Sequence, residues 1–361
     1  MGNGSLTSFS LLSIRDLIFL MLHFNCDYME GAHPTIIKRL TETNLEQTVG
    51  YGLDPYSKSA REKIKDACGC PAAEVVFLVG GTQANATVIK SILHVTEGVI
   101  AADSAHISVH EAGAIEFTGH KVLTIKGCNG KLTGSSVEKY MTSFLGDPTH
   151  PHMVQPGMVY ISHPTEFGTL YTRSELTELS SICHKYHMSL FLDGARLGYG
   201  LAAPGSDVTL KVLGECCDVF YIGGTKVGAL CGEAVVIPNT NLLKNFFTSV
   251  KQSGALLAKG RLLGIQFDTL FTDNLYFEIS RHAIQMAMKI KEALKAKGYE
   301  FYLDSNTNQQ LVMLTAEQKE KITKHATYDV FGFDEQGREI ARFATSWATR
   351  EEDVDALIKL L

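Results

Sequence analysis

The chain has 361 residues, of which 45% are hydrophobic and 20% are charged, and 33 basic against 39 acidic residues give a net charge of −6. This composition excludes a disordered chain, and no basic run could follow a phosphate backbone or lipid surface, so we expect neither nucleic acid nor a membrane as partner. The length favours a large domain with a smaller one attached. The eight cysteines form no CxxC pair, which is typical of reduced, mostly buried thiols in a cytoplasmic protein.

Residues 1–24 are predicted to form an N-terminal extension. Their apolar stretch from Leu17 to Phe24 follows Arg15 and Asp16 without a basic leader, and it is too short to span a membrane. Leu6 stands where a myristoylation pattern needs Ser or Thr. We favour a packing extension or a mis-assigned start over a degenerate signal peptide.

From about residue 75, short apolar runs alternate with stretches of helical period. Apolar strands bounded by helices predict an α/β fold with a mostly parallel central sheet covered on both faces. Such a sheet carries its chemistry at the carboxyl ends of its strands. The expected strands are 75–79, 98–103, 121–125, 158–162, 189–193, 218–224 and 233–238. The expected helices are 82–95, 110–117, a polar helix after 125 and one after Thr172.

The pattern changes after Pro238, where longer helices are expected at about 240–270 and 274–297. Strands near 299–303, 309–315 and 338–344 and a final helix complete a smaller α+β unit. We therefore predict a large domain at 25–245 and a small C-terminal domain at 246–361 that includes a bridging helix.

The first motif with chemical content is Gly80-Gly81-Thr82, between an expected strand and an expected helix. Free backbone N–H groups at a helix start favour a phosphate, and the helix dipole reinforces them. The motif matches neither GxGxxG nor a Walker loop, so a nucleotide-binding Rossmann oxidoreductase is disfavoured.

Asp193 ends an apolar strand and is followed by Gly194 and Ala195. A carboxylate in that place stays ionised only if a cation or strong donor meets it, and the small residues would let a flat ring approach. The alternative is an ordinary helix N-cap.

Lys226 follows another apolar strand, among several glycines. Burying an ammonium group costs several kcal/mol unless it is paired or neutralised. A lysine that forms an imine avoids this cost, because desolvation lowers its pKa and makes the amine nucleophilic. The alternative is a surface lysine in a glycine-rich loop.

Four motifs follow one another in the chain: GTQAN, SAHISVHEAGA, LDGAR and a lysine after Gly-Gly-Thr. In this order they resemble the threonine aldolase and β-eliminating lyase family, whose members depend on pyridoxal 5'-phosphate (PLP) and have fold type I, like aspartate aminotransferase. The resemblance covers roughly Asn25 to Trp347.

The resemblance implies a role for each matching residue. Lys226 would hold PLP as an imine, Asp193 would pair with its pyridine nitrogen, and His106 would stack on its ring. The phosphate would be held by Gly81, Thr82 and Thr225. A satisfied core histidine is the alternative for His106.

Two arginines match family positions that bind a carboxylate of the substrate. Arg196 would meet this carboxylate through its planar fork, and Arg342 of the small domain would be a second anchor. Surface arginines at the ends of elements are the alternative. Tyr51 resembles a family tyrosine near the cofactor that reaches across a dimer interface, although a core tyrosine is nearly as well supported.

The chain departs from the family at three places. A family histidine that acts on the β-hydroxyl is replaced by Glu166, and a carboxylate can accept that proton if its pKa suits. In the early Arg-Ser-Asp motif, which contacts substrate and phosphate, Cys26 replaces the serine. Lys251 replaces an arginine and keeps the charge without the fork.

The resemblance thus implies a lyase that cleaves a β-hydroxy-α-amino acid such as L-threonine or allo-threonine to glycine and an aldehyde. Catalysis would rest on Lys226, Asp193, His106 and Glu166, with no metal. Alternatives are β-elimination or transamination of another amino acid, and a non-catalytic protein that keeps the fold. The family also implies a homodimer or homotetramer with shared active sites and a small amino acid as the partner.

Overall fold

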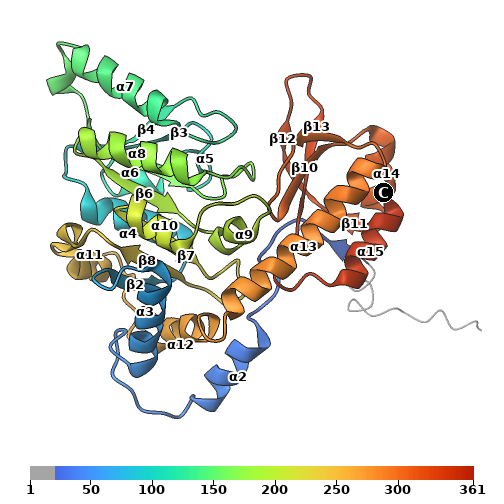
Figure 1. Cartoon of the computed structure of the whole chain (residues 1–361), viewed down its shortest axis with the longest axis horizontal. Helices are drawn as coiled ribbons and strands as arrows, with labels where there is room; N and C mark the ends of the chain where they lie inside the picture. Colours follow the sequence, from blue (N-terminus) through green and yellow to red (C-terminus); the bar gives the residue numbers. More distant parts are fainter. Residues whose placement is uncertain (1–20) are drawn as a thin grey trace, which may run out of the picture.

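The computed structural model describes residues 21–361 (Figure 1). Most of the expected N-terminal extension, with the interpretations of it as a signal peptide or packing segment and the myristoylation position, lies outside the described residues. Among residues 21–361, no helix is long and apolar enough to cross a membrane, and no cluster of His, Cys, Asp or Glu could hold a metal ion.

A seven-stranded sheet forms the centre of the larger part of the molecule. Its strands pair in parallel from β7 through β4, and β8 runs antiparallel to both of its neighbours. The predicted α/β fold with a mostly parallel sheet is therefore confirmed. In spatial order the strands are β2 (Glu74–Leu78), β8 (Glu233–Ile237), β7 (Val219–Gly223), β6 (Ser189–Asp193), β5 (Gln155–Ser162), β3 (Glu97–Ala102) and β4 (Val122–Ile125).

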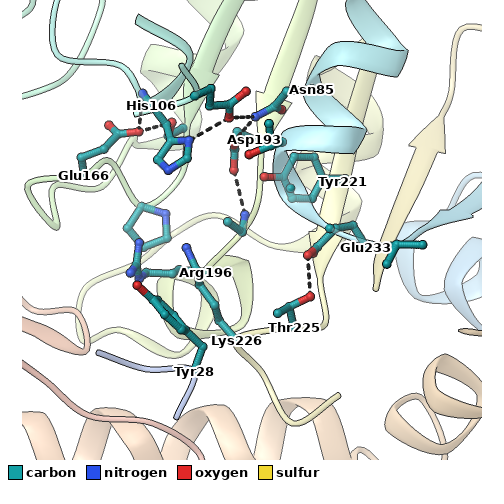
Figure 2. A pocket seen from close by; sticks show the side chains of 18 residues that line it. Tyr28, Asn85, His106, Glu166, Asp193, Arg196, Tyr221, Thr225, Lys226 and Glu233 are labelled. Atoms are coloured by element: carbon teal, nitrogen blue, oxygen red, sulfur yellow. Dashed lines mark hydrogen bonds and ion pairs between the residues drawn. The ribbon is translucent and has the colours of Figure 1, made fainter. Parts of the chain in front are cut away.

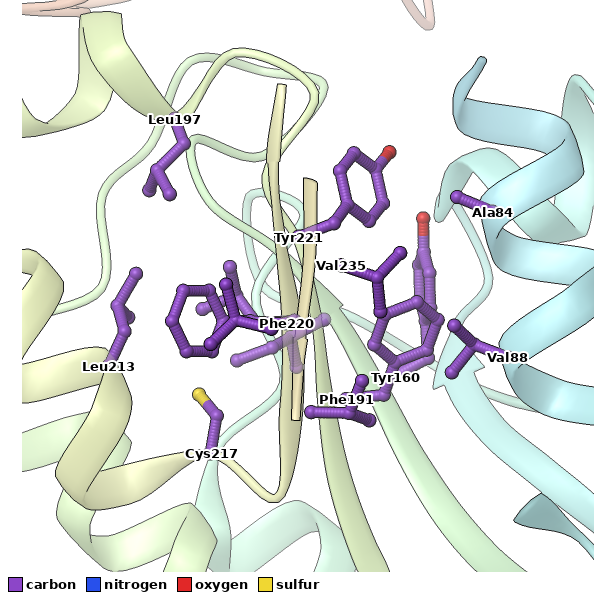
Figure 3. Close-up of a cluster of buried hydrophobic side chains, with 14 of the residues drawn as sticks. Ala84, Val88, Tyr160, Phe191, Leu197, Leu213, Cys217, Phe220, Tyr221 and Val235 are labelled. Atoms are coloured by element: carbon purple, nitrogen blue, oxygen red, sulfur yellow. The ribbon is translucent and has the colours of Figure 1, made fainter. Parts of the chain in front are cut away.

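Helices cover both faces of this sheet because its strands are apolar on both sides. Figure 3 shows Phe220 on the side of Leu213, in helix α10 (Leu210–Cys216), and the next residue, Tyr221, on the side of Ala84, in helix α4 (Gly81–Ile92). Both side chains are fully buried. Successive side chains of one strand thus point to opposite faces of the sheet, and each face packs against its own layer of helices.

The predicted helix after Thr172 is confirmed as α8 (Arg173–Lys185), which begins with a capping box between Thr172 and Glu175. The single helix predicted over 110–117 is wrong: two short helices flank a turn in which Ala112 and Gly113 have positive φ. The remaining helices of this part are α2 (Pro34–Glu42), α3 (Pro55–Cys68), α5 (His106–Val109), α6 (Ala114–Phe117), α7 (Gly134–Gly146), the 3-10 helix η1 (His150–His152) and α9 (Leu197–Ala202).

The single helix predicted at 240–270 is also wrong. Asn245 and Gly254 have φ angles of 64° and 66°, which a continuous helix does not allow. The segment instead forms η2 (Thr240–Leu243), α11 (Phe246–Gln252) and α12 (Arg261–Leu270). The long helix that follows is present as predicted, as α13 (Leu275–Ala296).

A four-stranded antiparallel sheet lies at the other end of the molecule (Figure 1). Its order is β12 (Asp329–Phe333), β13 (Glu339–Ala344), β10 (Gln309–Met313) and β9 (Glu300–Leu303), with helices α14 (Ala316–Thr323) and α15 (Glu351–Leu360) beside it. Strand β1 (Leu22–His23) pairs in parallel with β11 (Ala326–Thr327). The described part of the chain therefore begins on the C-terminal unit and crosses to the larger sheet after Phe24.

All eight cysteines are free thiols. Four are buried, three are partly buried and Cys128 is exposed, so burial is less general than predicted.

Candidate active site

A cavity of about 340 Å³ opens at the carboxyl ends of the parallel strands. It is lined by residues that directly follow β2, β5, β6 and β7. Figure 2 shows Lys226, Asp193, His106 and Glu166 arranged around this single space. The structure thus brings together residues that the sequence placed on separate strand ends.

Asp193 is buried at the end of β6 and is surrounded by donors. Its Oδ2 accepts hydrogen bonds from Tyr160 Oη at 2.5 Å and Asn85 Nδ2 at 3.1 Å, and its Oδ1 accepts one from the backbone N–H of Ala195 at 2.9 Å. The N-cap alternative is wrong, because Arg196 is the N-cap residue of the helix that follows. These donors are what an ionised carboxylate needs in a buried place.

Two glycines let the backbone approach closely beside Asp193. A Cβ on Gly194 would lie 1.9 Å from the carbonyl oxygen of Tyr221, and one on Gly223 would lie 2.3 Å from that of Ala195. Neither position has room for a larger residue, which accounts for the small residues at these strand ends.

Lys226 lines the cavity and is partly buried, so it is not a solvated surface lysine. Among the described residues, no carboxylate lies within ion-pair distance of its Nζ; the ring of Tyr28 has its centroid 5.7 Å away. Burial, and after it the charge of Arg196, lowers the pKa of Lys226. A lysine in this state offers a neutral, nucleophilic amine at lower pH than a solvated one.

His106 is oriented by a buried carboxylate. Its Nδ1 lies 2.7 Å from Oε1 of Glu111, and the same oxygen accepts a hydrogen bond of 2.7 Å from Asn85 Nδ2. The hydrogen bond to Glu111 raises the pKa of His106, although burial opposes it. A hydrogen-bonded chain therefore runs from His106 through Glu111 and Asn85 to Asp193.

Glu166 lies on the loop after β5 and lines the same cavity. Its Oε1 accepts hydrogen bonds from the backbone N–H of His106 at 3.0 Å and from Ser162 Oγ at 2.8 Å. Burial raises the pKa of Glu166 above its ordinary value. One oxygen is thus fixed, and no hydrogen bond to the other occurs among the described residues.

The three residues predicted to hold a phosphate meet at one end of the cavity. Gly81 and Thr82 start α4, where backbone N–H groups have no partner within the helix. Thr225 Oγ1 is hydrogen-bonded to Glu233 Oε1 at 2.8 Å and accepts from the backbone N–H of Gly232 at 3.0 Å. The hydroxyl of Thr225 is therefore already paired.

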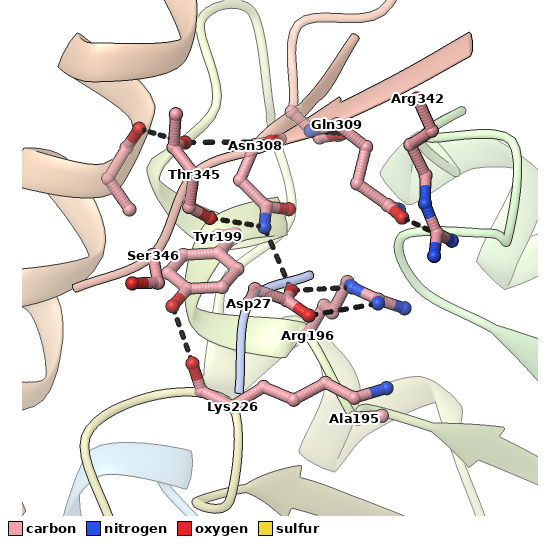
Figure 4. A network of polar contacts seen from close by, with 12 residues as sticks. Asp27, Ala195, Arg196, Tyr199, Lys226, Asn308, Gln309, Arg342, Thr345 and Ser346 are labelled. Atoms are coloured by element: carbon pink, nitrogen blue, oxygen red, sulfur yellow. Dashed lines mark hydrogen bonds and ion pairs between the residues drawn. The ribbon is translucent and has the colours of Figure 1, made fainter. Parts of the chain in front are cut away.

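Arg196 lines the cavity and forms a bidentate ion pair with Asp27 (Figure 4). Asp27 takes the edge formed by Nε and Nη2. A guanidinium has five N–H donors, so its outer edge stays available for a second carboxylate.

The other two residues predicted to bind substrate do not line the cavity. Arg342 donates to Gln309 Oε1 at 3.1 Å and to Asp329 Oδ2 at 2.7 Å, while its buried Nε has no partner within residues 21–361. Cys26 is partly buried, and it is its neighbour Asp27 that reaches Arg196.

Tyr51 lies outside this cavity, at a second, more apolar one of about 360 Å³ beside α11 and α12. The Nζ of Lys251 lies 4.8 Å from its ring centroid. Two positions that the sequence singled out separately thus meet, away from Lys226.

Sequence reasoning missed several residues of the site. Asn85 belongs to the GTQAN motif and Glu111 to SAHISVHEAGA, but neither was predicted to have a role. Asp27 belongs to the early motif that contains Cys26, and it was not predicted to have a role either. Glu233, a charged residue at the start of an apolar strand, was a signal that could have been used. Tyr160 gave none, because its ring fits the apolar strand pattern.

The fold defines the class of protein. A single mutant of Thermus thermophilus aspartate aminotransferase superposes with a TM-score of 0.69 at 16% identity, over 94% of this chain and 90% of that one. The architecture is therefore that of fold type I.

The chain belongs to the beta-eliminating lyase family, a family of PLP-dependent enzymes, whose model matches residues 24–318. It is 28% identical to the low specificity L-threonine aldolase of a Pseudomonas species over 337 aligned residues. The alignment covers 92% of this chain and 95% of that protein. A solved threonine aldolase from Leishmania major is 40% identical with a TM-score of 0.90, over 94% of this chain and 98% of that one. The predicted threonine aldolase-like class of lyase is confirmed.

Proposed function

We propose that the chain uses PLP to cleave a β-hydroxy-α-amino acid of the L-threonine or allo-threonine type to glycine and an aldehyde. The observation that carries this proposal is the convergence of Lys226, Asp193 and Glu166 on one cavity. The similarity to threonine aldolases supports the same reaction class.

The residues present fit a flat, polar, phosphorylated cofactor. Three buried polar atoms on the cavity wall have no hydrogen-bond partner in the part of the chain that the structure describes: Asn85 Oδ1, Glu111 Oε2 and Tyr221 Oη. Buried polar atoms normally have partners, so such atoms favour a polar ligand. A nucleophilic lysine, a hydrogen-bonded carboxylate and a helix start complete the set of groups that PLP needs.

Three side chains would hold the cofactor ring. Lys226 would bind it covalently, Asp193 would accept a hydrogen bond from its protonated pyridine nitrogen, and His106 would lie against its face. When bound, PLP supplies an electron sink for the electron pair left at Cα. The hydrogen bonds from Tyr160, Asn85 and the backbone N–H of Ala195 would hold Asp193 in place for this contact.

The other end of the cavity would hold the phosphate, through the N–H groups of Gly81 and Thr82 and the hydroxyl of Thr225. The substrate carboxylate would take the outer edge of Arg196, which Asp27 holds in a fixed direction. Arg342, which does not line the cavity, would be a second anchor from the small domain through its Nε, which has no partner among the described residues.

Glu166 would act as the general base. Its unpaired oxygen would accept the proton of the substrate β-hydroxyl, the Cα–Cβ bond would break, and the β-carbon would leave as an aldehyde. Cα would then take up a proton to give glycine. The raised pKa of Glu166 suits this step, because a base is most effective when its pKa lies near the working pH.

An amino-acid panel with product identification tests the proposal. We expect equal amounts of glycine and aldehyde from threonine or allo-threonine with PLP bound. A keto acid would indicate β-elimination or transamination instead, and no turnover of any amino acid would favour a non-catalytic protein.

We further propose a dimer or tetramer in which Tyr51 and Lys251 face the active site of the partner copy. Tyr51 lines the second cavity, and Lys251 contacts its ring. Leu53 and Phe247, which also line this cavity, are 68% and 62% exposed. Light scattering of the purified protein measures this state, and a monomer would contradict it.

A further inference from the structure

Glu233 is a buried carboxyl group at the phosphate end of the cavity, and the proposed reaction gives it no part. It is 3% exposed and starts β8, paired in register with Leu78 of β2. The chain from Leu78 leads directly into Gly81 and Thr82. Glu233 therefore lies beside the helix start that would hold the phosphate, and it lines the cavity.

The contacts of Glu233 are hydrogen bonds and not ion pairs. Its Oε1 contacts Thr225 Oγ1 at 2.8 Å (Figure 2). Its Oε2 accepts from the backbone N–H of Gly224 at 3.2 Å. No cation of the described residues lies within ion-pair distance of Glu233. An ionised Glu233 would be a buried charge without a counterion, which is costly.

Among the described residues, the titratable groups that face Glu233 include a single cation, Lys226. They are Asp193 of β6, Tyr221 of β7, Tyr276 of α13, and Lys226 and Cys231 of the segment between β7 and β8. Burial raises the pKa of Glu233 to about 8, against the lowering effects of Thr225 and Lys226.

We propose that Glu233 is a neutral carboxylic acid that positions Thr225 as a donor to the cofactor phosphate. Glu233 Oε1 carries the proton and donates it to Thr225 Oγ1. The O–H group of Thr225 is then free to donate a hydrogen bond to the phosphate. This inference rests on the proposed function, because it assigns a role at the same cofactor site.

The hydrogen-bond inventory favours this arrangement. Thr225 Oγ1 has one hydrogen and two lone pairs, and one lone pair already accepts from Gly232 N–H at 3.0 Å. If Glu233 were ionised, the only hydrogen of Thr225 would be used on it, and two anions would share one end of the cavity. With the acid form, the second lone pair accepts from Glu233, Oε2 still accepts from Gly224, and every group is satisfied.

Phosphate binding is then coupled to a proton on Glu233. A bound dianion favours the neutral acid, so above the pKa of the cofactor-free state each binding event takes up a proton. Affinity for the phosphate falls by up to about tenfold per pH unit in that range. Glu233 acts through Thr225, so it is a positioning residue.

Calorimetry of the full chain, freed of cofactor, tests the proposal with pyridoxamine 5'-phosphate, which binds without bonding to Lys226. Titrations at about pH 9 in two buffers of different ionisation enthalpy count the protons taken up. Pyridoxamine, which lacks the phosphate, is the matched ligand. The matched variant is Glu233→Gln, whose amide donates to Thr225 at every pH.

We expect the wild type to take up nearly one proton more than E233Q with the phosphorylated ligand, and no such difference with pyridoxamine. The affinity of the wild type falls relative to that of E233Q as the pH rises. Equal proton uptake and parallel affinities would overturn the role of Glu233 while leaving the cofactor site standing. If E233Q does not fold, the two ligands are compared on the wild type alone. Equal proton uptake on binding either ligand would then overturn the role of Glu233. Failure to bind the phosphorylated ligand at any pH overturns the cofactor site as well.

Discussion

The guanidinium of Arg196 donates two hydrogen bonds to the carboxylate of Asp27, at 2.7 Å from Nε to Oδ2 and 3.0 Å from Nη2 to Oδ1. Asn308 Nδ2 adds a third at 2.9 Å, so the carboxylate joins the early segment, the larger sheet and the small antiparallel sheet (Figure 4). Although burial opposes it, the charge of Arg196 lowers the pKa of Asp27. Asp27 is therefore ionised and aims the outer edge of Arg196 at the cavity.

Asp27→Asn leaves the charge of Arg196 buried without its counterion. We expect the free energy of unfolding to fall by about 3–5 kcal/mol, and KM for the amino acid to rise because the guanidinium is no longer held. Urea denaturation and steady-state kinetics measure the two effects.

Glu138→Gln is the matched control, because it breaks the exposed ion pair with Lys185 and is expected to change stability by less than about 1 kcal/mol. An Asp27→Asn protein as stable as this control would contradict the assignment.

Glu166→Gln removes the proposed base with little change of shape. We expect kcat to fall by about 100-fold or more, while the PLP content per chain stays unchanged. The base works when ionised, so activity is lost as the pH falls through the raised pKa of Glu166.

Ser162→Ala sharpens this test, because the hydrogen bond from Ser162 lowers the pKa of Glu166. We expect the acidic limb of the pH–rate profile to move to higher pH in this variant. A Glu166→Gln enzyme with the full kcat and the same acidic limb would show that Glu166 is not the base.

Gly264→Ala tests the crossing of α12 and α3. A Cβ at this position would lie 2.2 Å from Ser57 Oγ and 2.6 Å from the backbone N of Ser57. The two helices would have to move apart, so we expect a loss of about 1–3 kcal/mol or more in the free energy of unfolding. Gly332→Ala meets no atom within 4 Å and should leave the thermal midpoint nearly unchanged, whereas equal effects of the two changes would contradict the packing.

The sequence predicts the central sheet and the two charged residues at its strand ends well. Asp193 and Lys226 are visible because a charged residue at the end of an apolar strand, or just beyond it, departs from the apolar pattern. The breaks at Asn245 and Gly254 are harder to predict, because Asn and Gly permit a positive φ but also occur inside helices with a negative one. The pairing of Asp27 with Arg196 joins positions 169 apart, so it depends on the tertiary fold.

The roles of the site residues stay predictions, and attachment of PLP to Lys226 is the central one. The most direct measurement is borohydride reduction of the PLP-loaded protein, followed by digestion and mass spectrometry. We expect the reduced cofactor on Lys226 alone. Before reduction, we expect the visible absorbance of the imine to be lost in Lys226→Ala and kept in Lys185→Ala, a change at an exposed lysine. Cofactor on another lysine, or no covalent attachment at all, would contradict the proposed site.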